Sequence, residues 1–221
     1  TVHAIAEANG AIETGQAAMA TIDDDRRAAI RRNHTATHLL HWALREIVGD
    51  HVKQQGSWVG PDRLRFDFSH YESVTAEQIA AVEDLVNDEV LNNPSCRHFE
   101  TTMDEAQKLG AIAFFGDKYG DVVRVLEAGP NSTELCGGTH VKALGDIGMV
   151  KVLSEGSIGS NIRRIEAVTG DGTREALREV DCTLAATADA LGVANADEAP
   201  DAAERLQNEV KNLRKQLSAA K

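Results

Sequence analysis

The sequence predicts an α+β fold, in which helices pack on an antiparallel β-sheet and a helical, coiled-coil extension follows. Apolar residues recur at steps of three and four over residues 23–49 and again over 75–92, which indicates two amphipathic helices. Between them, residues 52–69 alternate apolar and polar side chains, which indicates a β-hairpin. Helices that alternate with antiparallel hairpins are typical of layered α+β domains.

The first helix has signals at both of its ends. Asp23, Asp24 and Asp25 place negative charge where the helix dipole favours it, and Gly49 marks the end of the periodic run. Residues 1–22 have no hydrophobic face large enough for an independent unit. We expect them to be the last hairpin of a preceding domain.

The hairpin and the second helix follow from shorter patterns. Gly60-Pro61-Asp62 is a turn signal, and Leu64, Phe66 and Phe68 alternate with polar residues after it. These apolar side chains should pack one face of the hairpin on the first helix. Thr75-Ala76-Glu77-Gln78 is a capping-box pattern that begins the second helix.

Short elements are expected between Cys96 and Gly170. The pattern predicts a helix of about two turns over residues 103–109. It predicts strands over residues 97–101, 122–127, 149–153 and 162–168.

Two further helices are expected at the C-terminal end. Residues 173–192 have helical periodicity, and residues 195–201, which include Pro200, read as a linker. Beyond it, apolar residues spaced four, three and four apart form a coiled-coil seam: Leu206, Val210, Leu213 and Leu217. Because so few heptads are not stable alone, we interpret residues 171–221 as a helical linker and the start of a coiled coil, available for dimerisation in a full-length protein.

The composition is that of an ordinary globular protein, with 42% hydrophobic residues and a net charge of -12. That charge disfavours generic nucleic-acid binding but leaves room for a local basic groove, because the field at the contact surface is what matters. Three tight basic pairs are available for such a groove: Arg31 and Arg32, Arg63 and Arg65, and Arg163 and Arg164.

The cysteines and the apolar runs bear on the compartment. Three widely separated cysteines argue against a disulfide framework and for a reducing environment. No run approaches the roughly 20 apolar residues of a membrane span, and residues 1–10 lack a signal-peptide pattern. We therefore expect a cytoplasmic protein that does not contact the membrane.

Two pairs of residues predict a metal site. His34 and His38 are four residues apart, a spacing that stacks both imidazoles on one face of a helix. Cys136 and His140 flank Gly137-Gly138, which suits a tight turn that brings both side chains onto one ion. Together these four ligands favour one Zn²⁺ per chain.

The alternative to a metal site is a buried cysteine beside histidines that face the core. Spacing also does not decide whether the site is closed and structural, or catalytic with an open position. His41 lies three residues beyond His38, where a supporting or RNA-facing role is possible, although an exposed histidine is the simpler interpretation.

Five motifs follow one another along residues 23–170: Asn33-His34-Thr35-Ala36-Thr37-His38-Leu39-Leu40-His41, Gln54-Gln55-Gly56-Ser57, Arg63-Leu64-Arg65-Phe66-Asp67-Phe68-Ser69-His70, Phe115-Gly116-Asp117-Lys118-Tyr119-Gly120 and Cys136-Gly137-Gly138-Thr139-His140. Together they resemble the editing domain of alanyl-tRNA synthetase. The flanks agree, because residues 1–22 resemble the end of the preceding barrel and 171–221 the start of the C-terminal linker.

The resemblance implies a zinc-dependent deacylase, with residues 23–170 as the editing domain. Its substrate would be tRNA(Ala) charged with serine or glycine, bound by the acceptor end of the tRNA. His34, His38, Cys136 and His140 would be the zinc ligands. The positions that recognise the amino acid would be Thr37, Gln54 and Ser57. The segments for ATP-dependent activation and transfer of alanine would lie outside this chain.

Three alternatives stay open. A free-standing trans-editing protein of the same superfamily would share the zinc motifs. The editing-like domain of threonyl-tRNA synthetase also has His-x-x-x-His and Cys-x-x-x-His, although residues 63–70 and 136–140 fit the alanyl type better. The third is a zinc-stabilised RNA-binding module without catalysis. Lys118 and the arginine pairs are candidates for gripping the acceptor stem or the terminal adenosine.

Overall fold

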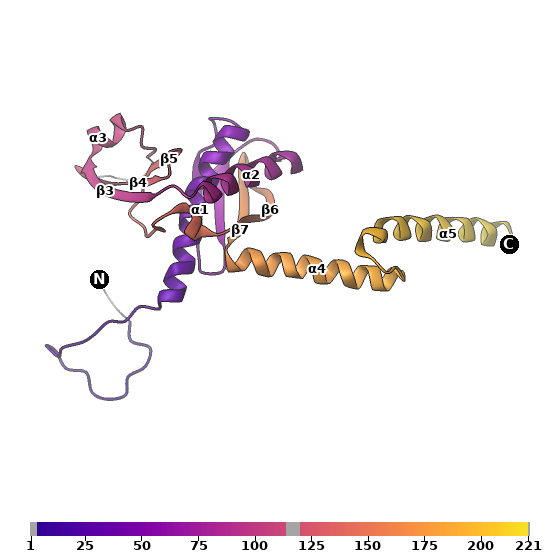
Figure 1. The fold of residues 1–221 in the computed structure, drawn as a ribbon, viewed down its shortest axis with the longest axis horizontal. Helices are drawn as coiled ribbons and strands as arrows, with labels where there is room; N and C mark the ends of the chain where they lie inside the picture. Colours follow the sequence, from indigo (N-terminus) through magenta and orange to yellow (C-terminus); the bar gives the residue numbers. More distant parts are fainter. Residues whose placement is uncertain (1–3, 114–119, 221) are drawn as a thin grey trace.

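The computed structural model describes residues 4–113 and 120–220, and Figure 1 shows their arrangement. The helices are α1 (Asp24–Ile47), α2 (Ala76–Asn92), α3 (Met103–Lys108), α4 (Asp171–Leu191) and α5 (Ala199–Ala219). The short 3₁₀ helices are η1 (Leu144–Ile147) and η2 (Ala196–Glu198). The strands are β1 (Gln54–Val59), β2 (Leu64–Ser69), β3 (Cys96–Thr102), β4 (Val122–Ala128), β5 (Ser132–Leu135), β6 (Val150–Gly159) and β7 (Ile162–Thr169). The predicted α+β class is confirmed.

Helix α1 is the central element of the domain. The Asp23 side chain accepts a hydrogen bond from the Arg26 backbone N–H and so caps the first turn. Leu39, Leu40 and Leu44 are fully buried on the faces of the helix that enter the core. Burial of this apolar stripe, rather than helix propensity alone, holds a helix of 24 residues in place.

The larger sheet has the strand order β1-β2-β7-β6, and every neighbouring pair is antiparallel. The predicted hairpin is confirmed, with Leu64, Phe66 and Phe68 buried in the same core cluster as the apolar residues of α1 and α2. The capping box at Thr75 and Gln78 is also present at the start of α2. Both helices therefore lie against one face of this sheet.

The smaller sheet has the order β3-β4-β5 and carries α3. Val123, Val125, Leu135 and Ala106 form its own small core. Strands β3 and β4 agree with the sequence prediction, but β5 and η1 were not predicted, because four-residue elements leave little periodicity to detect. Strand β5 ends one residue before Cys136, so this sheet positions half of the expected metal ligands.

The two ends of the chain differ from the prediction in part. No strand forms within residues 4–23, so the hairpin expected there is absent from the described chain, and the barrel remnant stays a prediction. The linker predicted over residues 195–201 was too long. It contains η2, and Pro200 lies in the first turn of α5, where its missing N–H costs nothing.

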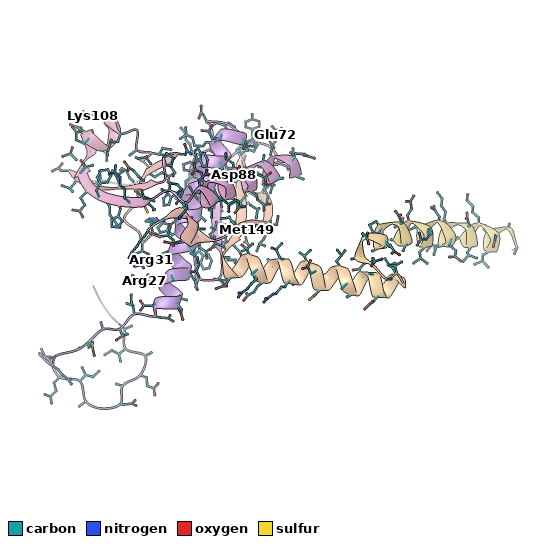
Figure 2. The ribbon with its side chains drawn as sticks, in the orientation of Figure 1. Arg27, Arg31, Glu72, Asp88, Lys108 and Met149 are labelled. Atoms are coloured by element: carbon teal, nitrogen blue, oxygen red, sulfur yellow. The ribbon has the colours of Figure 1, made fainter. Side chains whose placement is uncertain are left out.

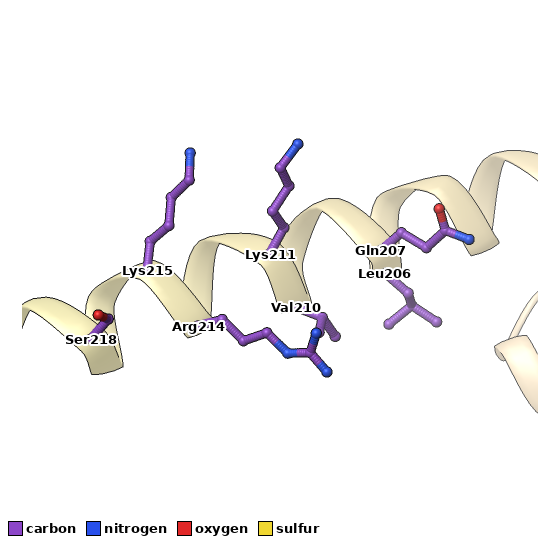
Figure 3. A pocket seen from close by; sticks show the side chains of 7 residues that line it. All are labelled: Leu206, Gln207, Val210, Lys211, Arg214, Lys215 and Ser218. Atoms are coloured by element: carbon purple, nitrogen blue, oxygen red, sulfur yellow. The ribbon is translucent and has the colours of Figure 1, made fainter.

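Helix α5 presents its seam to solvent. Leu206, Val210, Leu213 and Leu217 are each about half exposed. Figure 3 shows Lys211 and Lys215 projecting from the other side of the helix than Leu206 and Val210. Within residues 4–113 and 120–220, no helix has the length and the apolar content needed to cross a membrane.

Candidate metal centre

The four predicted ligands come together in space. His34 and His38 lie on α1, and Cys136 and His140 lie in the loop that follows β5. The four ligand atoms all lie within 4.8 Å of one another. Two groups that are about a hundred residues apart in sequence therefore form one cluster that could hold one metal ion.

Two of the distances between donor atoms match those of a tetrahedral site. Cys136 Sγ lies 3.5 Å from His34 Nε2 and 3.3 Å from His140 Nε2. In a tetrahedral zinc site, bond lengths of about 2.3 Å to sulfur and about 2.0–2.1 Å to nitrogen separate neighbouring donors by about 3.3–3.6 Å. One sulfur and three imidazole nitrogens are also a donor set that zinc favours. The residues therefore fit the ion.

Hydrogen bonds orient the imidazoles toward the centre of the cluster. The Thr35 hydroxyl donates to the Arg31 carbonyl oxygen at 2.9 Å and accepts from the Val141 backbone N–H at 3.2 Å. It also lies 3.3 Å from His140 Nδ1. Because its proton is already donated, this hydroxyl accepts from a protonated Nδ1, which leaves His140 Nε2 free to ligate.

Glu134 supports the second histidine in the same way. It is 1% exposed, and its carboxylate binds His38 Nδ1 with one oxygen and His41 Nδ1, at 2.7 Å, with the other. A carboxylate behind a ligating imidazole fixes the tautomer and raises the basicity of the ligand. Sequence reasoning missed Glu134. Its position in the sequence could have revealed it. Glu134 lies two residues before Cys136 in an extended segment, and this spacing puts both side chains on one face.

The expectation for His41 was wrong. We expected an exposed histidine, but His41 is 2% exposed and is held by Glu134. Its ring also packs 5.4 Å from the ring of Phe66, centroid to centroid. His41 lies one turn after His38 on the same face of α1, so both imidazoles can bind the same Glu134 carboxylate.

The electrostatics of the cluster call for a cation. Burial alone would raise the pKa of the Cys136 thiol, but hydrogen bonds with His140, His34 and His38 lower it to about 3, so the group is a thiolate at neutral pH. Burial lowers the pKa of His140 to about 4, so its imidazole is neutral. Burial also acts to lower the pKa of His38, but the charge of Glu134 outweighs it and raises that pKa. The buried Glu134 carboxylate and the partly buried Cys136 thiolate thus have one compensating positive charge, the proton on His38. A divalent cation at the cluster would supply that positive charge in place of the proton.

The two glycines between Cys136 and His140 have different surroundings. A Cβ atom on Gly138 would lie 2.0 Å from His34 Cε1, whereas one on Gly137 would meet nothing within 4 Å. The Gly138 backbone is fixed on both sides, because its N–H donates to Cys136 Sγ at 3.4 Å and its carbonyl oxygen accepts from Arg124 at 2.5 Å. Gly138 is therefore required by its contact with His34.

The three residues expected to recognise the amino acid are only partly brought together. Gln54 Nε2 lies 3.5 Å from Ser57 Oγ, where it can donate. Gln54 and Ser57 pair with the buried Phe68 and Phe66, so both face the side of the sheet that carries α1. Thr37 is 3% exposed on α1, and its hydroxyl donates to the Asn33 carbonyl oxygen at 2.9 Å.

A cavity of about 110 Å³ lies next to His41, the residue that shares the Glu134 carboxylate with the ligand His38, and none of the four predicted ligands lines it. His41 and Arg45 of α1, Gln54 of β1 and Ile112 are among the residues that line it. Residues 114–119 lie outside the described residues. They include most of the motif Phe115-Gly116-Asp117-Lys118-Tyr119-Gly120, whose position relative to the cavity is therefore not described. Through His41, Glu134 and His38, a chain of two hydrogen bonds joins the cavity to the metal cluster.

Comparison with known proteins gives concordant matches. Residues 123–166 match the family described as the second additional domain of threonyl and alanyl tRNA synthetases. An alanine–tRNA ligase of Xanthomonas campestris is 49% identical over 214 residues, which cover 97% of this chain and 24% of the ligase. That of Thermotoga maritima is 48% identical over 217 residues, 98% of this chain and 25% of the ligase. The chain thus spans about a quarter of the length of the curated relatives it matches.

Proposed function

The chain corresponds to a segment of an alanyl-tRNA synthetase, and from that premise we propose that it hydrolyses the ester of tRNA(Ala) wrongly charged with serine or glycine. The observation that carries the proposal is the four-ligand cluster linked by hydrogen bonds to a small cavity. A cavity of about 110 Å³ has the scale of an amino-acid side chain rather than of a whole nucleotide.

Such an activity answers a selectivity problem of the parent enzyme. A small apolar pocket cannot strongly reject an isostere that adds one hydroxyl, so a site that activates alanine also accepts serine at times. Because serine is larger than alanine, a second site that sorted by size would destroy the correct product first. The editing pocket must therefore sort by chemistry.

We assign this sorting to Thr37, Gln54 and Ser57, of which Gln54 lines the cavity, Thr37 is buried on α1 and Ser57 is exposed. Their hydroxyl and amide groups would hydrogen-bond the serine hydroxyl and would lose those partners beside the methyl group of alanine. Each buried polar group left without a partner costs about 1–3 kcal/mol. Although the Thr37 proton is donated to Asn33, the hydroxyl oxygen keeps a lone pair that can accept from serine.

Zinc, as the proposed occupant of the centre, would be held by His34, His38, Cys136 and His140 and would supply Lewis-acid character there. The chain's own residues do the rest. Glu134 and Thr35 hold a proton on Nδ1 of His38 and His140, so that both rings present Nε2 to the centre. Gln54 and Ser57 orient the side chain of the substrate. His41 closes the cavity on the side of α1.

Replacing Thr37 with Val should reduce the discrimination between seryl- and alanyl-tRNA(Ala) by about tenfold, because one hydrogen bond is worth about 1–1.5 kcal/mol. The substitution keeps the shape of the side chain and deletes its hydroxyl. Hydrolysis rates on both substrates give the ratio.

Thr187→Val is the matched control, because the Thr187 hydroxyl makes the same kind of bond to the residue four positions earlier, at 2.7 Å, on an exposed face of α4. The ratio for Thr187→Val should equal that of wild type. A Thr37→Val protein with an unchanged ratio would show that Thr37 does not contact the amino acid.

One observation favours a second candidate, a zinc-stabilised RNA-binding module without catalysis. All four tetrahedral positions can be filled by protein ligands, as in closed structural zinc sites. The same hydrolysis assay separates the two, because the module would bind tRNA without releasing serine.

A further inference from the structure

The ligand-bearing face of α1 continues toward the start of the helix as a basic stripe. Successive residues of an α-helix are rotated by about 100°, so Arg27, Arg31, His34 and His38 lie within about 40° of one line along the axis. Arg27 and Arg31 are both half-buried. Figure 2 labels them on the first turns of α1, at the lower end of the helix. The ligands His34 and His38 follow along the same line.

The arginines that the sequence offered for a basic groove are mostly engaged elsewhere. Arg163 binds both oxygens of Glu155, and Arg164 binds both oxygens of Asp67. Arg65 stacks over the ring of Trp58 at 5.3 Å. These side chains are therefore committed to the sheet and are poorly placed to bind a ligand's charge.

Arg27 and Arg31 differ from these arginines in their ion pairing. Across the two described ranges, 4–113 and 120–220, neither guanidinium forms an ion pair. Arg31 Nε is buried and has no hydrogen-bond partner there. Arg32 Nε is also without one, but Arg32 lines a pocket together with Asp62 and Asp171. In a chain with 35 acidic and 23 basic residues, two partly buried arginines without carboxylates in one line call for an anionic ligand.

We propose that Arg27 and Arg31 bind the phosphodiester backbone of the RNA strand whose 3′ end enters the metal centre. The inference rests on the proposed function, because it takes the aminoacylated 3′ end as the group held beside the cluster. Arg31 precedes His34 by about 4.5 Å along the axis, and Arg27 precedes Arg31 by about 6 Å. A strand with its terminal ribose at the cluster would thus pass both guanidinium groups, which match phosphate geometry well.

The test compares two double variants of the whole 221-residue chain, R27Q/R31Q and R26Q/R32Q. Both remove two positive charges from adjacent positions of the same helix, but Arg26 and Arg32 lie on its other faces. The probe is an uncharged RNA hairpin that ends in a single-stranded CCA, titrated at several salt concentrations. Because Arg32 packs against Gly170, R205Q/R214Q on the exposed face of α5 is a second control of equal charge.

R27Q/R31Q should weaken binding by at least about tenfold near 0.1 M salt, because each lost phosphate contact on a single strand is worth about fivefold there. The slope of log K against log salt should become shallower by about 1.4. Both controls should change binding only slightly. An equal loss in all three variants, or none in R27Q/R31Q, would overturn the proposal.

This readout is independent of catalysis. If wild type releases no serine but R27Q/R31Q still loses RNA binding selectively, the proposal of ester hydrolysis is wrong and the proposal that Arg27 and Arg31 bind the RNA backbone is supported. If wild type hydrolyses the ester and R27Q/R31Q has an unchanged KM, the proposal that Arg27 and Arg31 bind the RNA backbone is wrong and the proposal of ester hydrolysis is supported.

Discussion

Cys136→Ala should lower the zinc content of the purified protein from about one atom per chain to nearly none. Loss of a group that merely supports a ligand costs about 10–100-fold in metal affinity, and loss of the ligand itself costs more. The substitution removes the only sulfur in the cluster and the thiolate whose charge helps to hold a cation. Metal analysis after dialysis measures the effect.

Cys182→Ala is the matched control for this experiment. Cys182 is exposed on α4, outside the metal cluster, so the same substitution there should leave the zinc content unchanged. Equal zinc in the Cys136→Ala and Cys182→Ala proteins would remove Cys136 from the ligand set.

Gly138→Ala should have the second largest effect on metal binding, although it changes no ligand. A new Cβ 2.0 Å from His34 Cε1 must displace that imidazole or the loop that carries Cys136 and His140. We expect zinc affinity to fall by at least about tenfold, comparable to the loss of a group that orients a ligand. Competition with a chelator gives the affinity.

Gly137→Ala controls for the general cost of an alanine in this loop. Its Cβ would meet nothing within 4 Å, and neither glycine has a positive φ, so both backbones accept an alanine. Gly137→Ala should bind zinc as wild type does. Similar affinities for the Gly138→Ala and Gly137→Ala proteins would contradict the contact between Gly138 and His34.

The sequence was informative where a pattern is long or chemically distinctive. Helix α1 and the β1–β2 hairpin were predicted because their periodicity runs over many residues. The four ligands were predicted because histidine and cysteine at paired spacing have few other common roles, and the structure brings them together.

The rest of the site depends on contacts that no local pattern reveals. Glu134 is a single carboxylate in a four-residue strand, and its bonds to His38 and His41 span more than ninety residues of sequence. His41 looked exposed because the residues that bury it, Phe66 of β2 and Glu134 of β5, lie far along the chain. The commitment of Arg163 and Arg164 to ion pairs likewise follows only from strand register.

The central claim is that this chain is a zinc-dependent hydrolase of mischarged tRNA(Ala), and steady-state kinetics on purified Ser-tRNA(Ala) test it most directly. The four ligands and the cavity lie within residues 34–140, so the chain alone should release serine, and only when zinc is supplied. The KM should exceed that of a complete synthetase at similar kcat, because the additional parts of the relatives would hold the tRNA at high effective concentration and a net charge of -12 attracts it poorly. No zinc-dependent release of serine at any tRNA concentration would contradict the claim and favour the RNA-binding module.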